Sequence, residues 1–146
     1  MNSSNQSYLF APSLNLGEAI APVSLEPQKL QVCQHYNHHL RVLIPTTVDG
    51  DREADTSAFV DRANLLFSQQ FGGTICKHFL GFYESKNYGL VKEVIFEIEA
   101  WTNDLGLKQA ESFLENFLVE VLQELRQETV FFAIDGKAQL LTLGSR

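Results

Sequence analysis

The hydrophobic positions of this chain change their spacing in an ordered way. Some segments alternate between apolar and polar residues or form short apolar runs, and others repeat apolar residues every three or four positions. The segments with strand character are 40–44, 74–83, 90–101 and 129–134, and those with helical character are 56–70 and 107–126. The pattern therefore predicts the element order β-α-β-β-α-β.

This order predicts an α+β, ferredoxin-like βαββαβ fold, in which two helices cover one face of a four-stranded antiparallel sheet. Asp135-Gly136 favours a turn into a possible extra C-terminal strand at 138–143. Gly72-Gly73 ends the first helix, whereas anions bind at helix N-termini, so we interpret this pair as a corner and not as a phosphate loop. Residues 1–29 are predicted to be an N-terminal extension, partly disordered or docked, and 30–146 the folded domain.

Alternation divides the central hairpin into two faces. One face is predicted to lie under the helices, which favours a packed thiol and a core histidine over a Cys–His nucleophile. That buried set comprises Cys76, His78, Leu80, Phe82, Val94, Phe96, Ile98 and Ala100. The residues that we expect to form an interface on the other, free face are Ile75, Lys77, Phe79, Tyr83, Ile95, Glu97 and Trp101.

The free face would leave a large apolar patch in an isolated chain, and such patches normally mark an interface. We therefore expect self-association through this face, as a homodimer. The alternative is that the N-terminal extension or the extra terminal strand covers the face within one chain. Lys77 could pair with Glu97 if the hairpin register brings them opposite each other.

Charge narrows the classes of partner. The net charge is −7 and the pI about 5.0, and the eleven Lys and Arg residues are scattered along the chain. A nucleic acid requires a basic surface and an anionic membrane attracts one, so neither partner is expected. The N-terminus lacks signal-peptide features, and no apolar run is long enough to span a membrane. A cytoplasmic protein with two reduced cysteines is the prediction.

Metal binding is the weaker interpretation of two segments. Cys33, His35 and His39 share one side if the chain is extended there, which could suit zinc, but their spacing matches no standard site. The acidic residues Asp49, Asp51, Glu53 and Asp55 could bind a divalent cation, yet the loop lacks the glycine and glutamate of a calcium-binding loop. No metal and no cofactor are therefore expected.

From Leu40 to Ile134 the chain resembles small, uncharacterised bacterial ferredoxin-like proteins. The residues that carry the resemblance are Phe71-Gly72-Gly73-Thr74, Gly81-Phe82-Tyr83, Gln127-Glu128 and Val130. The resemblance covers about two-thirds of the chain. It implies a fold, and it implies no catalytic residues.

Three functions are consistent with these observations. The first is a non-enzymatic, homodimeric interaction or regulatory module, because no catalytic motif is present and a free sheet face is expected. The second is a small ligand-binding protein or enzyme with a pocket at the sheet face, where Glu93, Glu97, Tyr83 and Trp101 are candidate acid-base and stacking groups, with His78 added if the faces are reversed. The third is a metal-binding protein that uses the Cys33, His35 and His39 cluster.

Overall fold

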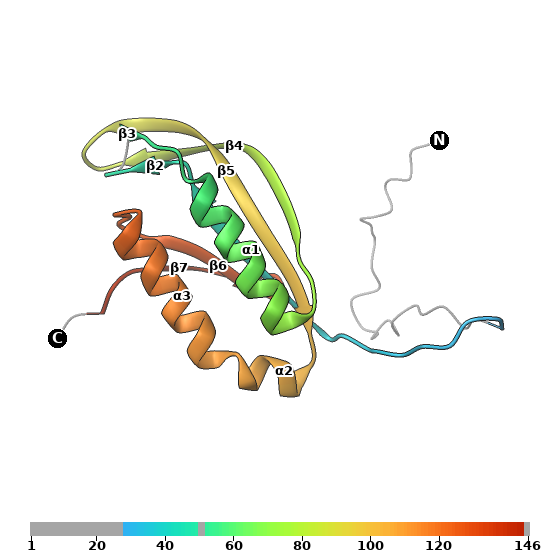
Figure 1. Ribbon diagram of the computed structural model, residues 1–146. Helices are drawn as coiled ribbons and strands as arrows, with labels where there is room; N and C mark the ends of the chain where they lie inside the picture. The colour runs from blue at the N-terminus through green and yellow to red at the C-terminus, as the bar shows by residue number, and fades with distance from the viewer. Residues whose placement is uncertain (1–27, 50–51, 145–146) are drawn as a thin grey trace, which may run out of the picture. The chain divides into compact units, whose positions relative to one another are not determined.

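The computed structural model describes residues 28–49 and 52–144 (Figure 1). The predicted extension at 1–29 lies almost wholly outside this range, and the elements below belong to the unit Gln34–Arg146. The strands are β1 (His38–Pro45), β2 (Thr47–Val48), β3 (Arg52–Glu53), β4 (Ile75–Ser85), β5 (Gly89–Thr102), β6 (Val130–Ile134) and β7 (Lys137–Leu141). The helices are α1 (Ser57–Phe71), α2 (Asp104–Gln109) and α3 (Glu111–Glu124).

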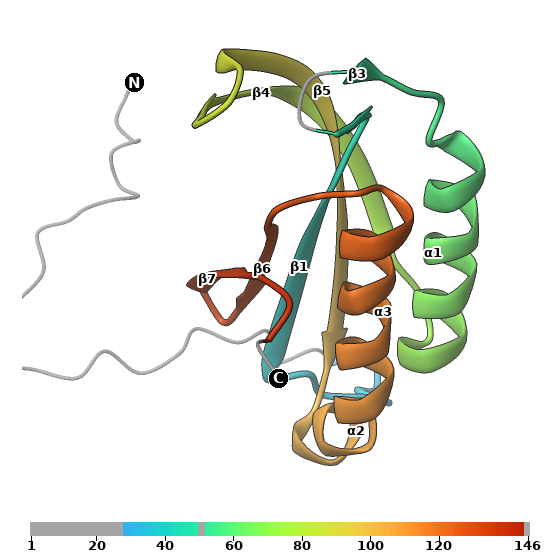
Figure 2. The same ribbon diagram turned by 90° about the vertical axis from the view of Figure 1, so that its left-hand side faces the viewer.

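The main sheet has five strands in the order β4-β5-β1-β6-β7, and each neighbouring pair is antiparallel. A separate two-stranded ladder joins β2 and β3. Figure 2 shows α1 and α3 side by side on the same side of the main sheet. The fold is therefore α+β, as expected. The C-terminal strand β7 extends the sheet at the edge beside β6 and does not cover a face.

Helix α1 forms because apolar residues recur along one side of the segment, and the helix buries that stripe. The buried residues are Phe59, Val60, Ala63, Phe67 and Phe71. Near the start, the Asp55 carboxylate accepts a hydrogen bond from the Ser57 backbone N–H at 3.0 Å. At the end, Gly72 has φ of +90° and its N–H bonds the Ser68 carbonyl, so the glycine corner is where the spacing predicts it.

The second predicted helix is interrupted. Instead of one helix over 107–126, the structure has α2 and α3, which are separated at the fully buried Ala110. Asn103 caps α2 early, because its side-chain oxygen accepts the Gly106 N–H at 2.8 Å. The extra turn therefore begins at Asp104, ahead of the apolar stripe, and the stripe itself continues in α3.

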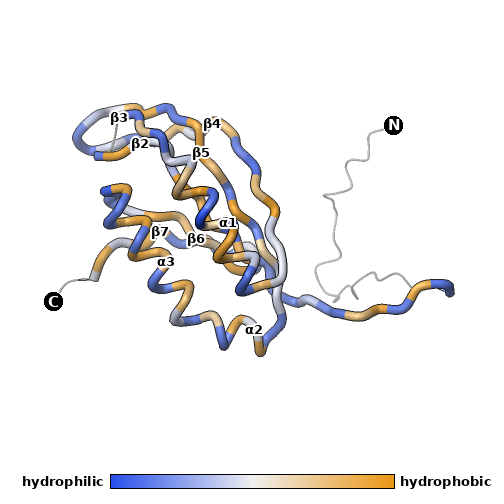
Figure 3. The backbone as a smooth tube through the Cα atoms, viewed as in Figure 1, coloured by the Kyte–Doolittle hydropathy of each residue, from blue (hydrophilic) through white to orange (hydrophobic). Residues whose placement is uncertain are grey.

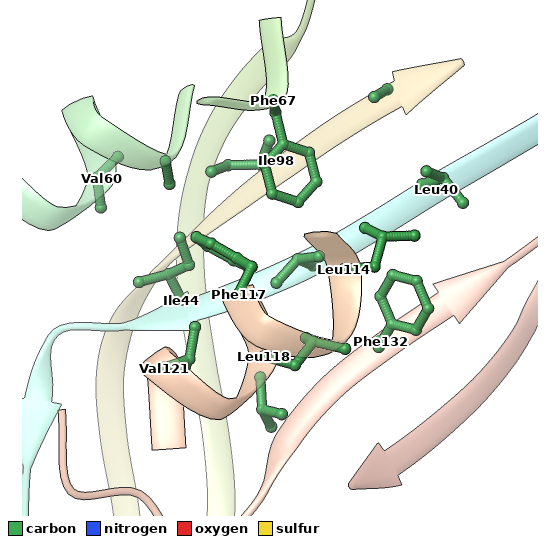
Figure 4. Close-up of a cluster of buried hydrophobic side chains, with 14 of the residues drawn as sticks. Leu40, Ile44, Val60, Phe67, Ile98, Leu114, Phe117, Leu118, Val121 and Phe132 are labelled. Atoms are coloured by element: carbon green, nitrogen blue, oxygen red, sulfur yellow. The ribbon is translucent and has the colours of Figure 1, made fainter. Parts of the chain in front are cut away.

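The core lies between the helices and β5, β1 and β6 (Figure 4). Phe67 is fully buried and meets Phe117 edge-on, with ring centroids 4.9 Å apart. Along the strands, Leu40, Val42 and Ile44 alternate into this core. Figure 3 shows the matching alternation of hydrophobic and hydrophilic segments along the helices and strands.

One sequence expectation about the core is wrong. Cys76, His78, Leu80 and Phe82 of β4 are exposed and do not lie beneath the helices. Five strands at about 4.8 Å spacing are wider than two helices at about 10 Å each, so an edge strand stays uncovered. In β5, Ile98 and Ala100 are buried, but Phe96 is only half-buried and Val94 is exposed.

Candidate functional site

The sheet face turned away from α1 and α3, called the open face below, carries two buried carboxylates at its centre. Glu97 and Glu99 are only 4% and 7% exposed, although the described helices all lie on the other side. They share the open face because Ile98 and Ala100, at the alternate positions of β5, point into the core. Their ion-pair partners among the described residues come from the neighbouring strands β1 and β4.

Glu99 bridges the two neighbouring strands. Its Oε1 lies 2.8 Å from His39 Nε2 on β1, and its Oε2 lies 2.8 Å from Lys77 Nζ on β4. The hydrogen bond from Lys77 lowers the pKa of Glu99 most, burial opposes this, and His39 adds a smaller lowering. The same hydrogen bond raises the pKa of Lys77. Glu99 is thus a carboxylate held ionised between two basic groups.

Glu97 is ion-paired with Arg41 and shares Lys77 with Glu99. Arg41 Nε donates to Glu97 Oε2, and Lys77, which lies directly opposite Glu97 in the hairpin register, approaches Oε1 to 3.8 Å. Lys77 is nearer to Glu99 than to Glu97. The Arg41 guanidinium also lies over the Phe131 ring, 5.5 Å from its centroid. Two acids and two permanent cations therefore alternate across β4, β5 and β1.

An aromatic surface borders this network. Trp101 stacks on the His39 ring at 4.6 Å with an interplanar angle of 20°, and it keeps 37% of its surface exposed. The register places Trp101 opposite His39 on β1, and Trp101 lies two residues from Glu99 along β5, on the same face. An exposed indole beside a charged cluster offers a flat apolar face on which a planar ligand can stack.

A third buried acid lies further along β5. Glu93 is 7% exposed, and its Oε2 accepts a hydrogen bond from the buried Thr47 hydroxyl at 2.5 Å. Between Glu93 and Glu97, the Ile95 side chain leans over Gly81 so closely that a Cβ on the glycine would lie 2.0 Å from Ile95 Cδ1. Gly81 therefore gives Ile95 room to cover the hairpin between the acids.

The predicted free-face residues divide into two groups. Ile75, Phe79, Tyr83 and Trp101 are exposed, as is Lys77 beyond its ion pairs. Glu97 is buried and Ile95 is half-buried, so these two present little surface to a partner. The candidate ligand groups are also dispersed: Glu97 and Trp101 flank Glu99, whereas Glu93 and Tyr83 lie toward the hairpin end of the sheet.

The predicted metal ligands do not come together. Cys33 and His35 are exposed, while His39 binds Glu99. In the acidic loop, Asp49 accepts hydrogen bonds from Arg126, which lower its pKa, and Asp55 accepts from Ser57; Asp51 lies outside the described residues. Across 28–49 and 52–144, no group of three or more His, Cys, Asp or Glu side chains could hold a metal ion.

A second charged cluster was not anticipated from the sequence. His38 Nε2 lies 2.5 Å from Asp104 Oδ1, and His38 Nδ1 lies 2.7 Å from Asp135 Oδ2. Hydrogen bonds to Asp135 and then Asp104 raise the pKa of His38, and both aspartates have lowered pKa values because of His38. The cluster joins β1, the start of α2 and the β6–β7 turn. The sequence does place both aspartates at the ends of predicted elements, and in the fold these ends meet the start of β1.

A groove opens on the helix side, between α3 and the C-terminal strands. It has a volume of about 450 Å³ and a mainly apolar wall. Leu118, Phe132 and Leu141 contribute to this wall, and Glu111 and Glu115 of α3 also line it.

No helix in the described part of the chain has the length and hydrophobicity needed to cross a bilayer.

Comparisons with known proteins show a shared fold. A phage SAM lyase in complex with S-methyl-5'-thioadenosine is similar with a TM-score of 0.59 at 15% identity, over 77% of this chain and 97% of that chain. A phage SAM lyase in the apo state also gives 0.59, at 18% identity, over 82% and 99%. No family model and no curated protein matches the sequence. The chain thus has an α+β fold that it shares with these two lyase structures.

Proposed function

We propose that this chain is a small-ligand enzyme or binding protein, and that its ligand is S-adenosyl-L-methionine (SAM) or a related adenosyl sulfur compound. The observation that carries the proposal is the pair of buried, ion-paired carboxylates Glu97 and Glu99 on the open face beside the exposed Trp101. This is the second of the functions that the sequence suggested.

The energetics of the charged network favour a functional role. Burying an ion pair costs about as much desolvation energy as its attraction returns, so such pairs add little stability compared with apolar residues. Here Glu97 and Glu99 occupy a sheet face where apolar side chains would pack as well. Buried carboxylates with specific partners at an open surface are candidate ligand groups.

The arrangement of charges suits a ligand of mixed charge. SAM carries a sulfonium cation, an ammonium group and a carboxylate, together with a planar adenine. Glu97 and Glu99 can attract the cations, the remaining N–H groups of Arg41 can bind the carboxylate, and the Trp101 indole can stack on the base. Each of these groups lies on β1, β4 or β5 of one sheet face.

The fold adds support of a coarser kind. The order β4-β5-β1-β6, with antiparallel neighbours and helices on one side, fits a ferredoxin-like βαββαβ core to which β7 is added, and we propose this assignment. The similar structures are SAM lyases, one of which holds S-methyl-5'-thioadenosine. At 15% and 18% identity this likeness concerns the fold, so the charged open face carries the argument for the ligand.

If the chain is itself a lyase, SAM would be cleaved at the bond between sulfur and the amino-acid side chain, without addition of water. The bonding electrons would go to sulfur, while the carbon that leaves sulfur would form a new bond to an oxygen of the ligand's own carboxylate. Neutral S-methyl-5'-thioadenosine and a lactone that keeps the ammonium group would be released, so that atoms and charge balance. A buried carboxylate near the sulfonium binds the charged reactant more tightly than the neutral product, which would favour product release.

The test is calorimetric titration of the full chain with SAM, S-methyl-5'-thioadenosine and S-adenosyl-L-homocysteine. The last compound retains the amino acid and adenine but lacks the sulfonium charge. We expect SAM to bind at least tenfold more tightly than S-adenosyl-L-homocysteine, and Glu99→Gln to reduce this preference. Glu128→Gln, an exposed acid outside the open face, is the matched control.

Chromatography of the incubated mixture then shows whether the chain is an enzyme or only a binding protein, because a lyase releases S-methyl-5'-thioadenosine. Absence of binding by all three compounds to a folded chain would refute the proposal. In that case the non-enzymatic, homodimeric regulatory module would be the better prediction.

A further inference from the structure

We propose that a second copy of this chain docks along the outer edge of β4, by antiparallel pairing centred on Phe79. The proposal concerns the β4–β5 arm, defined as residues 75–94, and it does not depend on the ligand at the open face.

The arm exposes apolar side chains on both faces of the sheet. Ile75, Phe79 and Tyr83 are exposed on the open face. Leu80 and Phe82 lie on the helix side of the sheet, beyond the area that α1 and α3 cover, and are 57% and 60% exposed. A strand that is apolar on both sides is typical of the interior of a sheet or sandwich. Yet β4 is the outermost strand of the described sheet, with β5 as its neighbour on one side alone.

An edge strand of this kind is a hazard unless something pairs with it. Natural proteins protect exposed edges with charges, prolines, bulges or a covering element. Residues 75–83 contain no proline and pair with β5 without a break in register. Their one charged residue is Lys77, whose amine is already held by Glu99 at 2.8 Å. Within the part of the chain that the structure describes, segment 75–83 therefore has no proline, no bulge and no lysine that is left without an ion pair.

Charge favours another copy of the same chain as the occupant. The protein carries a net charge of −7, so two copies repel each other over most of their surface. The segment 75–83 is the exception, because its lone cation is neutralised within the chain. Two copies can therefore meet there without placing like charges in contact.

The register follows from antiparallel geometry and side-chain chemistry. Two residues that lie opposite each other must direct their peptide groups either both toward the joint or both away from it. The two-fold axis therefore passes midway between a residue and its own copy. Centring it on Phe79 pairs the whole apolar segment with itself, and the pairs are Ile75 with Tyr83, Cys76 with Phe82, Lys77 with Gly81, His78 with Leu80 and Phe79 with its own copy. A shift by one residue would instead place Glu84 opposite Cys76.

The contact area would lie at the lower end of the range for specific complexes. Nine paired residues with large side chains on both faces would bury on the order of 500 Å² per copy, which together approaches the ~1,000 Å² lower bound for specific interfaces. The joint also continues the open face from one copy to the next, since opposite residues of a pair point to the same side.

Site-directed cross-linking tests both the partner and the register. In a Cys33→Ser/Cys76→Ser background, Phe79→Cys should form an intermolecular disulfide under mild oxidation, because facing Cα atoms lie about 5 Å apart. Leu80→Cys is the matched control on the same strand. In this register its two copies lie about 8 Å apart, beyond disulfide reach, so it should stay monomeric on a denaturing gel.

Sedimentation equilibrium of the unmodified chain provides an independent readout. We expect a concentration-dependent dimer that Leu80→Glu weakens at least tenfold and that Leu105→Glu, an equally exposed leucine on α2, leaves unchanged. All of these sites are exposed, so the variants should fold. A monomer at every concentration, or cross-linking at position 80 and not at 79, would overturn the proposal.

Discussion

At the scale of single residues, several contacts between distant elements are made by ionisable side chains rather than by apolar ones. Glu97 and Glu99 are buried on the open face, opposite the described helices, and His38 joins two aspartates from distant elements. Neither arrangement can be inferred from local spacing, because each partner comes from a different strand or loop. The sequence did identify Glu97, Lys77 and Trp101 as open-face residues, since alternation along a strand determines the face.

The His38 cluster predicts a pH dependence with a definite sign. The pKa of His38 is raised in the folded chain above 6.5, so its contribution to stability is complete below that pH and is lost as pH rises through the raised pKa. The lowered pKa values of Asp104 and Asp135 contribute stability above about 3.8, which is lost as pH falls through their folded values. The contribution of the cluster is therefore greatest between these limits.

Urea unfolding of the wild type and His38→Asn from pH 5 to pH 9 measures this contribution. The difference in unfolding midpoint should be largest near pH 5–6 and should shrink as the solution becomes alkaline. His35→Asn, an exposed histidine in the segment before β1, should show no such trend. A difference that stays constant over the range would contradict the assignment.

At the scale of elements, local pattern predicted the stripes and strands well and failed where packing decides. The α1 stripe and the Gly72 corner follow from spacing and from glycine's conformational freedom. The break at Ala110 and the exposure of Leu80 and Phe82 do not, because they depend on where an early cap begins a helix and on how far two helices reach across five strands.

Gly81 offers a test of packing within the hairpin. Gly81→Ala would place a Cβ against Ile95 Cδ1, so Ile95 must move, at a cost of about 1–2 kcal/mol in the free energy of unfolding. Ile95→Val removes Cδ1 and should recover most of this loss in the double variant. Gly73→Ala, whose Cβ would meet nothing within 4 Å, is the control. Equal effects at Gly73 and Gly81 would show that chain entropy, not contact with Ile95, is responsible.

At the scale of the whole molecule, charge and apolar surface act against each other. A net charge of −7 on each copy opposes association, while the largely apolar segment 75–83 of β4, with Lys77 neutralised by Glu99, would favour the proposed pairing. Salt screens the repulsion with a Debye length of about 10 Å at 0.1 M and strengthens apolar contacts little in this range. The balance between copies is therefore set by ionic strength.

We expect the dimer association constant to rise about two- to fivefold between 20 and 300 mM NaCl at pH 7.5, as repulsion between the copies is screened. Sedimentation equilibrium at a series of salt concentrations measures this change. Near pH 5, the isoelectric point, the salt effect should vanish. An association that weakens with salt at pH 7.5 would indicate an interface built from ion pairs and not from the β4 edge.

The position of β1 has a consequence for how the protein is made. This strand lies between β5 and β6, so β1, the first strand in the described part of the chain, acquires its full second neighbour only when Ile134 has left the ribosome. Asp135, which accepts the His39 N–H at 2.8 Å, follows one residue later. Because pairing between distant segments is slow and leaves strand edges open meanwhile, the sheet is expected to close during synthesis only after residue 134 has emerged.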